Sequence, residues 1–491
     1  MIRFLLIVLL FVTTNLIAQQ KLIEVKEDKS YTGRLDGFTD NQGNIVVLYH
    51  SYVTKEGRTT HYTNILFHTS QSSKKIELRD KLILKGHAYD ENTYTLFFFN
   101  GYYIQVSKDG ENLMKSGVYN YGDEEEFAEF SYQGTFYRIT YPHKNNKVNM
   151  VKIKSGGEVE KTGFTYEHDW EKSSNYWNSR HFIHNDHQLQ RDKYNYLKEP
   201  EANRNGKKQQ IELDAVVPQN TKLFFNNGDL AFSQFSHDDE RYNIKIVTFN
   251  EASRQLDEKI IPLGISYNKE KNLKLLPIEV NKKKERKKYQ FPFDGKIFVV
   301  STVKGEIELN IIDIKSGQTL KNYLFNENSK DVPLFQQPLF INSKKVESYD
   351  ETNKTITYLD KFSDDDPYIN VYRKDDKIAV TLGSYKLEEN NTPSYGGATG
   401  LSLSISHSIT GWVDKINHTH FYLDKETHEV HPEEKYELFP YEKVLKYMAM
   451  IKIDKSLKTK DEIGIPAKGK TYFVYFSKKK AVGIVDISEI K

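Results

Sequence analysis

Residues 295–325 read GKIFVVSTVKGEIELNIIDIKSGQTLKNYLF, and this stretch decides the fold. Three runs rich in Val, Ile, Leu and Phe are separated by turns that contain Gly305 and Ser316-Gly317. Branched and aromatic side chains suit a pleated, half-buried surface, and glycine supplies the positive φ that tight turns need. The stretch therefore predicts three consecutive antiparallel strands.

Similar units recur along the chain, and a second Ser-Gly turn occurs at Ser155-Gly156. The other units begin at Gly43, Thr93, Gly134, Gly228, Asp376 and Gly469. Their spacing of about 40–95 residues fits one or two repeats of a β-propeller, in which small sheets stack and few edges stay exposed. We expect an all-β irregular β-propeller of roughly six to eight blades, with tandem β-sandwich domains as the alternative.

The two ends of the chain also carry strand patterns. Residues 481–487 read AVGIVDI, and residues 21–25 read KLIEV. A propeller gains stability when such terminal strands share one blade, because neither is then left as an unpaired edge. We expect these two segments to pair.

Composition excludes several classes of protein. The 491 residues contain 70 basic and 68 acidic side chains, so the net charge of +2 provides no field for nucleic acid or an anionic membrane. There is no cysteine, which removes disulfides, thiolate metal sites and cysteine nucleophiles. The 27 glycines and 13 prolines are too few for collagen-like or low-complexity chains.

The first 20 residues, MIRFLLIVLLFVTTNLIAQQ, have the pattern of a secretory leader. Arg3 precedes an apolar run, and Ala18 is a small residue suited to cleavage before Gln19. We expect residues 1–18 to be a signal peptide and residues 19–491 to form the exported propeller; an uncut N-terminal anchor is the alternative. The protein is then periplasmic, surface-bound or secreted by a bacterium, with no transmembrane segment after cleavage.

Two polar stretches interrupt the strand pattern and predict loop insertions at about 173–210 and 391–412. The second reads NTPSYGGATGLSLSISHSITGW and is rich in Gly, Ser and Thr. A third segment, GIPAKGKT at residues 464–471, fits a phosphate-binding P-loop. That mechanism needs a helix after the loop, whereas TYFVYFSKKKAVGIVDI predicts a β-hairpin. We expect Gly469 to be a turn residue.

Histidine pairs offer two candidate metal sites. His181 and His184 are three residues apart, which brings both near one face if the segment is helical. His418 and His420 alternate, which puts both rings on one face of a strand. A solvated polar segment explains the first pair, and ordinary strand packing the second. The sequence leaves these interpretations open beside the metal sites, and it implies no cofactor.

His428 and His431 follow the second pair closely and are its candidate further ligands. Three aromatic residues, Trp170, Tyr176 and Trp177, gather near the first pair. Exposed aromatic rings stack on sugars or anchor protein partners, although core packing also explains them. They are the candidate ligand-binding residues.

No catalytic motif stands out, so the sequence favours a non-enzymatic binding or scaffolding module of the cell envelope. Its partner is then a protein or a glycan. Two alternatives stay open: a hydrolase acting on extracellular glycans or peptides, and a metal-binding protein that uses the histidine pairs. Both need side chains that only the fold can bring together.

Overall fold

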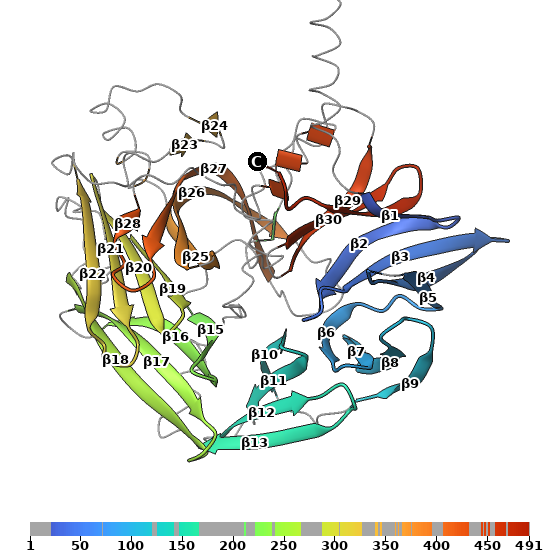
Figure 1. The fold of residues 1–491 in the computed structure, drawn as a ribbon, viewed down its shortest axis with the longest axis horizontal. Coiled ribbons are helices and arrows are strands. Elements are labelled where there is room, and N and C mark those ends of the chain that lie inside the picture. The colour runs from blue at the N-terminus through green and yellow to red at the C-terminus, as the bar shows by residue number, and fades with distance from the viewer. Residues whose placement is uncertain are drawn as a thin grey trace, which may run out of the picture. The chain divides into compact units, whose positions relative to one another are not determined.

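Nearly all the regular structure in the computed structural model is β-strand (Figure 1). The described residues are 21–70, 72–119, 125–141, 147–165, 211–212, 221–237, 241–266, 287–303, 305–326, 339–341, 344–345, 359, 362, 366–374, 376–394, 406–431, 443–444, 446–447, 450–451, 457–467 and 470–490. Helical residues occur singly or in pairs, the pairs being 443–444, 446–447 and 450–451. No helix in these ranges is long and apolar enough to cross a membrane.

The chain divides into two compact units. The first comprises Met1–His143, Asn149–Thr162 and Glu437–Lys491. The second comprises Lys144–Val148 and Gly163–Tyr436. Both units are built from mainly antiparallel sheets in which most neighbouring strands are also consecutive in the chain.

The first unit contains four groups of four strands. Their bounds are β1 (Lys21–Lys26), β2 (Ser30–Thr39), β3 (Ile45–Lys55), β4 (Arg58–His68), β5 (Ser73–Leu78), β6 (Leu84–Tyr89), β7 (Thr93–Phe98), β8 (Tyr102–Ser107), β9 (Leu113–Val118), β10 (Glu125–Tyr132), β11 (Thr135–Tyr141), β12 (Lys147–Ile153), β13 (Val159–Thr165), β29 (Thr459–Ala467), β30 (Lys470–Ser477) and β31 (Ala481–Asp486). The groups are β2–β5, β6–β9, β10–β13, and β1 with β29–β31. β13 ends in the second unit, where Thr165 pairs in parallel with Gln255.

The predicted pairing of the terminal strands is confirmed. β1 runs antiparallel to β31, with Val25 opposite Val482 and Lys21 opposite Val485. The segment after the P-loop-like residues is a hairpin, as predicted, because β30 pairs with β31 and Val474 lies opposite Ile484. β29 also pairs with β30, with Ala467 opposite Lys470, while Gly469 lies outside the described residues. No helix follows the P-loop-like residues, so the geometry that a P-loop needs is missing there.

The central strands of the sheets are buried on both faces. Along β3, Val46 and Leu48 belong to a core shared with β6–β9, while Val47 and Tyr49 belong to a core shared with β29–β31. Alternate residues of a strand point to opposite faces, so continuous burial requires a neighbouring sheet on each side. This explains why the central strands are continuous apolar runs.

The second unit repeats this pattern. Its strands are β14 (Ile211–Glu212), β15 (Thr221–Asn226), β16 (Asp229–His237), β17 (Arg241–Asn250), β18 (Gln255–Ser266), β19 (Lys287–Phe293), β20 (Lys296–Val303), β21 (Glu306–Asp313), β22 (Thr319–Asn326), β23 (Leu339–Ile341), β24 (Lys344–Lys345), β25 (Asp366–Lys374), β26 (Lys377–Ser394), β27 (Ser406–Asp424) and β28 (Val430–His431). β25–β28 belong to a seven-stranded sheet, in which β27 also pairs with β14 and β23, and β23 pairs with β24. The groups β15–β18, β19–β22 and β25–β28 share one apolar core. The stretch 295–325 forms β20, β21 and β22, as its pattern predicts.

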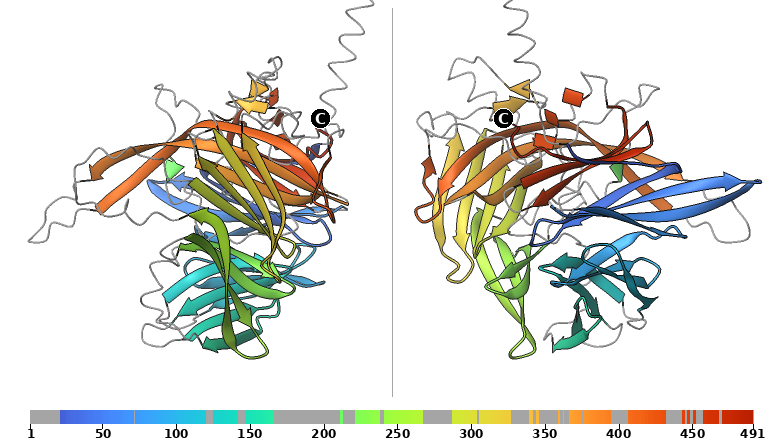
Figure 2. Two further views of the ribbon diagram at one scale, coloured as in Figure 1. Left: turned by 90° about the vertical axis from the view of Figure 1, so that its left-hand side faces the viewer. Right: turned by 45° about the vertical axis from the view of Figure 1, so that its right-hand side comes forward.

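β26 and β27 form a long hairpin, seen in orange in Figure 2. Residues 391–394 and 406–412 of the predicted second insertion belong to these strands. The rest of that insertion, and all of the first at 173–210, lie outside the described residues, as do the leader residues 1–20.

Stacked four-stranded antiparallel sheets buried on both faces are the blades of a β-propeller, whereas a sandwich sheet is buried on one face only. The described strands form six sheets, of which four have four strands, one has eight and one has seven. The eight-stranded sheet consists of β10–β13 and β15–β18, joined where Thr165 pairs with Gln255, so dividing it there gives seven blades, within the expected six to eight. The fold class is an irregular β-propeller.

The terminal strand pairing predicts a selective cross-link. In this cysteine-free chain, Val25→Cys combined with Val482→Cys should form a disulfide on mild oxidation and stabilise the fold by about 4 kcal/mol, because a very long loop is closed. Gel mobility and urea unfolding with and without reductant measure both effects. The control pair Val25→Cys with Val485→Cys is out of register and should stay reduced. Equal oxidation of both pairs would refute the register.

Candidate functional site

Most of the predicted site residues stay untested by the structure. Those outside the described residues are Trp170, Tyr176, Trp177, His181 and His184. Their roles in ligand stacking and metal binding remain predictions. The other two, His418 and His420, lie on β27.

His418 and His420 are buried, with 5% and 1% of their surface exposed. Their ring centroids are 4.8 Å apart, so the two imidazoles lie close together as their spacing predicts. The Nδ1 atom of His420 is 2.9 Å from the hydroxyl of Thr381 on β26, which holds that ring in the sheet. The pair offers two imidazoles at one place.

The two following histidines do not complete a recognisable metal site. His428 lies in the β27–β28 turn, where burial lowers its pKa. His431 lies 3.9 Å from a carboxylate oxygen of Asp424. Within the described ranges, no three His, Asp or Glu side chains are close enough to hold one ion. Protein zinc sites use at least three side chains, so the metal role of the pair stays a prediction.

Exposed apolar side chains gather at the β6–β9 sheet. The large hydrophobic residues that are exposed in the described part of the chain are Phe99, Leu113, Met114, Val118, Val159, Ile260, Leu320 and Leu324. Four of these eight fall in residues 99–118. Met114 is 59% exposed and Val118 is 74% exposed, both on the outer strand β9. Such clustering marks interaction surfaces more often than scattered single residues do.

β9 also lacks the charges that protect an edge strand. Its sequence LMKSGV has one charged residue in six, whereas the outer strand β5, SKKIEL, has three. Charged side chains on an edge discourage pairing with another chain. The sequence contained this signal, namely an apolar outer strand after a polar turn, but exposure cannot be read from a single strand.

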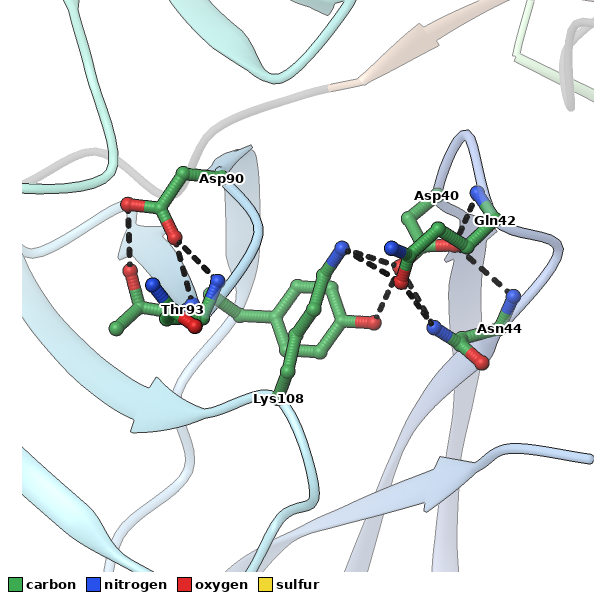
Figure 3. A network of polar contacts seen from close by, with 8 residues as sticks. Asp40, Gln42, Asn44, Asp90, Thr93 and Lys108 are labelled. Carbon is green, nitrogen blue, oxygen red and sulfur yellow. Dashed lines mark hydrogen bonds and ion pairs between the residues drawn. The ribbon is translucent and has the colours of Figure 1, made fainter. Parts of the chain in front are cut away.

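The turn that leads into β9 is anchored by a buried ion pair (Figure 3). The Nζ atom of Lys108 lies 2.9 Å from Asp40, whose side chain is fully buried in the β2–β3 turn. Asp40 also accepts hydrogen bonds from the Tyr94 hydroxyl at 2.8 Å and from the Asn44 side chain at 2.9 Å. Burial alone would raise the pKa of Asp40, but these donors together hold it below its usual value.

Two further contacts fix the same turn. The backbone N–H of Lys108 donates to the carbonyl of Asn92 at 2.8 Å. Gly110 has a φ of +73°, and a Cβ there would lie 2.7 Å from the Phe67 ring. A close approach and a positive φ both require glycine at this position. The β8–β9 hairpin is therefore held firmly against β2–β5.

A buried lysine in the second unit is the other group that sequence reasoning missed. Lys222 on β15 is 1% exposed, and its Nζ donates to the Tyr289 hydroxyl of β19 at 3.1 Å. Burial lowers its pKa to about 7. A neutral amine is a nucleophile, but the absence of exposed surface keeps reactants away from it in this structure. The sequence signal for this burial was the alternation of Lys222 with Phe224 in an apolar strand pattern.

Comparisons with known proteins find similar solved structures but no similar sequence. No protein family and no curated protein matches the sequence. The Dos1 propeller is 8% identical, with 96% of each chain covered and a TM-score of 0.35. The WD40 domain of SCAP from fission yeast is 9% identical, with 96% of this chain and 98% of that chain covered and a TM-score of 0.34. BamB from Moraxella catarrhalis is 7% identical, with 96% and 100% covered and a TM-score of 0.29. The fold class rests on the strand pattern itself.

Lys108→Met should destabilise the protein by about 3 kcal/mol at pH 7, because it leaves the buried Asp40 carboxylate without its cation. The pKa of Asp40 is lowered in the folded state, so this loss should shrink as the pH falls below about 4 and Asp40 takes up a proton. The free energy of unfolding in urea, compared at pH 7 and pH 3, measures this loss. Lys74→Met is the control, because its partner Glu111 is half exposed, and it should cost less than about 1 kcal/mol. Equal losses would show that Lys108 is no anchor.

Because Lys222 is buried, the free energy of unfolding should increase with pH. The unfolded chain keeps a proton on this lysine up to about pH 10.4, whereas the folded chain loses it near 7, so unfolding becomes harder between these values. Lys222→Met should stabilise the protein by a few kcal/mol at pH 6, at about 1.4 kcal/mol per pKa unit, and lose most of this advantage by pH 10. Urea unfolding from pH 6 to 10 tests this. Lys154→Met, at an exposed turn, should show no such trend. Parallel curves for wild type and Lys222→Met would contradict it.

Proposed function

We propose that this protein is an exported binding or scaffolding module that docks a protein partner on the exposed edge formed by β9. A β-propeller supports binding or scaffolding in general, because it is a rigid frame that presents strands and loops. The observation that carries the proposal is the exposure of Leu113, Met114 and Val118 on one outer strand. An ion pair that is buried beneath the turn holds this strand in place.

The chemistry of the edge fits a polypeptide better than a sugar. Leu113, Met114 and Val118 are aliphatic or thioether side chains, which gain free energy by burial against other apolar groups. Sugar sites combine aromatic stacking with many polar groups. Among the described residues, Phe99 is the exposed aromatic residue at the β6–β9 sheet, and the Nζ atom of Lys85 lies 5.4 Å from its ring centre. We therefore place a protein, not a glycan, on β9.

The exported location belongs to this proposal and rests on the leader pattern of residues 1–20. A cysteine-free chain suits an exported protein that does not depend on disulfides. The near-neutral net charge of +2 also fits a partner recognised by shape and apolar contact rather than by a long-range field. The proposed sites of action are the periplasm, the cell surface or the medium.

Site-specific photo-cross-linking in the native host tests the proposal. A photoreactive amino acid at Met114 should give one discrete cross-linked protein, because the side chain reaches into the interface. The same group at Lys154, an exposed turn position, should give none. The identified partner should bind the purified chain at least 10-fold more weakly after Val118→Asp, which places a charge in the apolar contact. The recovered chain should begin at Gln19.

Two outcomes would overturn the proposal. Cross-linked products that are the same for positions 114 and 154 would show that β9 has no partner of its own. A recovered chain that still carries residues 1–18 and stays in the cytoplasm would remove the exported location.

A further inference from the structure

We propose that β9 binds its partner by strand addition, with an extended segment of the partner pairing along the β9 backbone and placing an acidic residue opposite Lys115. This inference rests on the proposed function and names the chemistry of the partner. It follows from which backbone groups, side chains and charges β9 leaves available.

The backbone register identifies the outward-facing groups of β9. The N–H of Tyr119 donates to the carbonyl of Gly101 at 2.7 Å, so Tyr119 bonds toward β8. Hydrogen-bonding groups alternate in direction along an antiparallel strand. Gly117 and Lys115 therefore bond toward β8, and the N–H and C=O groups of Ser116 and Val118 point away from the sheet.

The side chains of β9 divide between two faces. Lys115 lies opposite Gln105, and Gly117 lies opposite Tyr103, so these share one face. Ser116 and Val118 lie on the other face. Above them, the register shifts between Gln105 and Val106, which breaks the regular pairing near Leu113. The regular edge is therefore Lys115–Val118, and an added strand has to centre there.

Lys115 supplies the electrostatic preference. Its side chain is exposed, and its Nζ atom lies 6.0 Å from the centre of the Tyr103 ring. No carboxylate of the described residues forms an ion pair with Lys115. Opposite charges on directly facing strand residues are favourable and like charges are unfavourable. An added strand gains most from an aspartate or glutamate opposite Lys115, with apolar residues toward Leu113 and Val118.

The neighbouring edge in the same unit is built differently. On β5, Lys74 pairs with Glu111, Lys75 with Glu27, and Glu77 with Lys29. Every charge on that edge is already paired within the chain. Unlike β5, β9 has one charge, on Lys115, that no carboxylate of the described residues pairs with.

A second copy of this chain fits the edge poorly. If a two-fold axis at Ser116 relates two β9 strands, each Lys115 lies opposite Gly117 of the other copy and diagonal to its Lys115, and no carboxylate of β9 faces either lysine. The six residues of β9 span only about 20 Å. Pairing over this length alone buries less surface than the roughly 1,200 Å² of a stable interface. A single peptide segment needs no such area, because backbone hydrogen bonds supply its affinity.

The test uses the full mature chain and blocked synthetic peptides of alternating valine and threonine with one central glutamate. The companion probes carry lysine in place of glutamate, or N-methyl groups on alternate amides. Fluorescence polarisation should show the glutamate peptide binding at least 5-fold tighter than the lysine peptide, and the N-methylated peptide not binding. Lys115→Glu should reverse the preference for glutamate over lysine.

The matched variants separate backbone pairing from stability. Ser116→Pro removes an N–H that points outward, so the melting temperature should stay within about 2 °C while peptide affinity falls at least 10-fold. Ser116→Thr keeps the N–H and should bind as wild type.

Unchanged binding by Ser116→Pro, or an unchanged charge preference in Lys115→Glu, would overturn strand addition. Failure of the glutamate peptide to bind at about 1 mM would do the same. If cross-linking at Met114 still identifies a partner, docking on β9 survives and only its mode is wrong. If cross-linking fails as well, the proposed function falls with it.

Discussion

The structure depends on the burial of both faces of small sheets. Along β7, Leu96 and Phe98 enter the core shared with β2–β5, while Phe97 between them packs on Phe136 of β11 with ring centroids 4.7 Å apart. A four-stranded sheet cannot shield both faces by itself, so each blade is stable only beside its neighbours. The pairing of β1 with β31 extends the same requirement to the terminal strands.

Stacked sheets leave polar backbone groups of the turns close to the cores, and aspartates satisfy them. Asp40 and Asp90 occupy the first turn of successive blades and accept the N–H groups of Gln42 and Asn92, at 2.9 and 2.7 Å. Each aspartate also accepts a hydrogen bond from the next blade, Asp40 from the hydroxyl of Tyr94 and Asp90 from the hydroxyl of Ser155. The same side chain therefore closes its own turn and joins two blades, which apolar packing alone does not specify.

Local patterns predicted the elements well because the signals are local. The stretch 295–325 formed its three strands, residues 471–487 formed a hairpin, and the β-type runs at the two ends of the chain paired as expected. The glycine with positive φ in the turn after Ser155 was predicted one residue too early, because it is Gly157 and not Gly156. Such an offset changes no strand, because either glycine tolerates that conformation.

Properties of the candidate site depend on distant parts of the chain and were not readable in the same way. Lys222 alternates with Phe224 along β15, but the sequence does not show that β19 covers this face of the strand. The spacing of His418 and His420 predicted two neighbouring rings, but whether they are buried depends on β26. Five of the predicted site residues lie in residues 166–210, outside the described part, so their roles remain predictions.

The hairpin that carries β9 combines a rigid base with an exposed edge. Lys108 at its base is 11% exposed and tied to the neighbouring blade, whereas Val118 at its end is 74% exposed. The fold needs the first feature, since Asp40 would otherwise be a buried carboxylate without a cation. It does not need the second, because aliphatic side chains on an outer strand lose free energy to water and invite unwanted pairing. A feature that costs stability and lies on a firmly held frame is best explained by binding, in which the partner covers the apolar edge and a rigid strand loses little entropy on association.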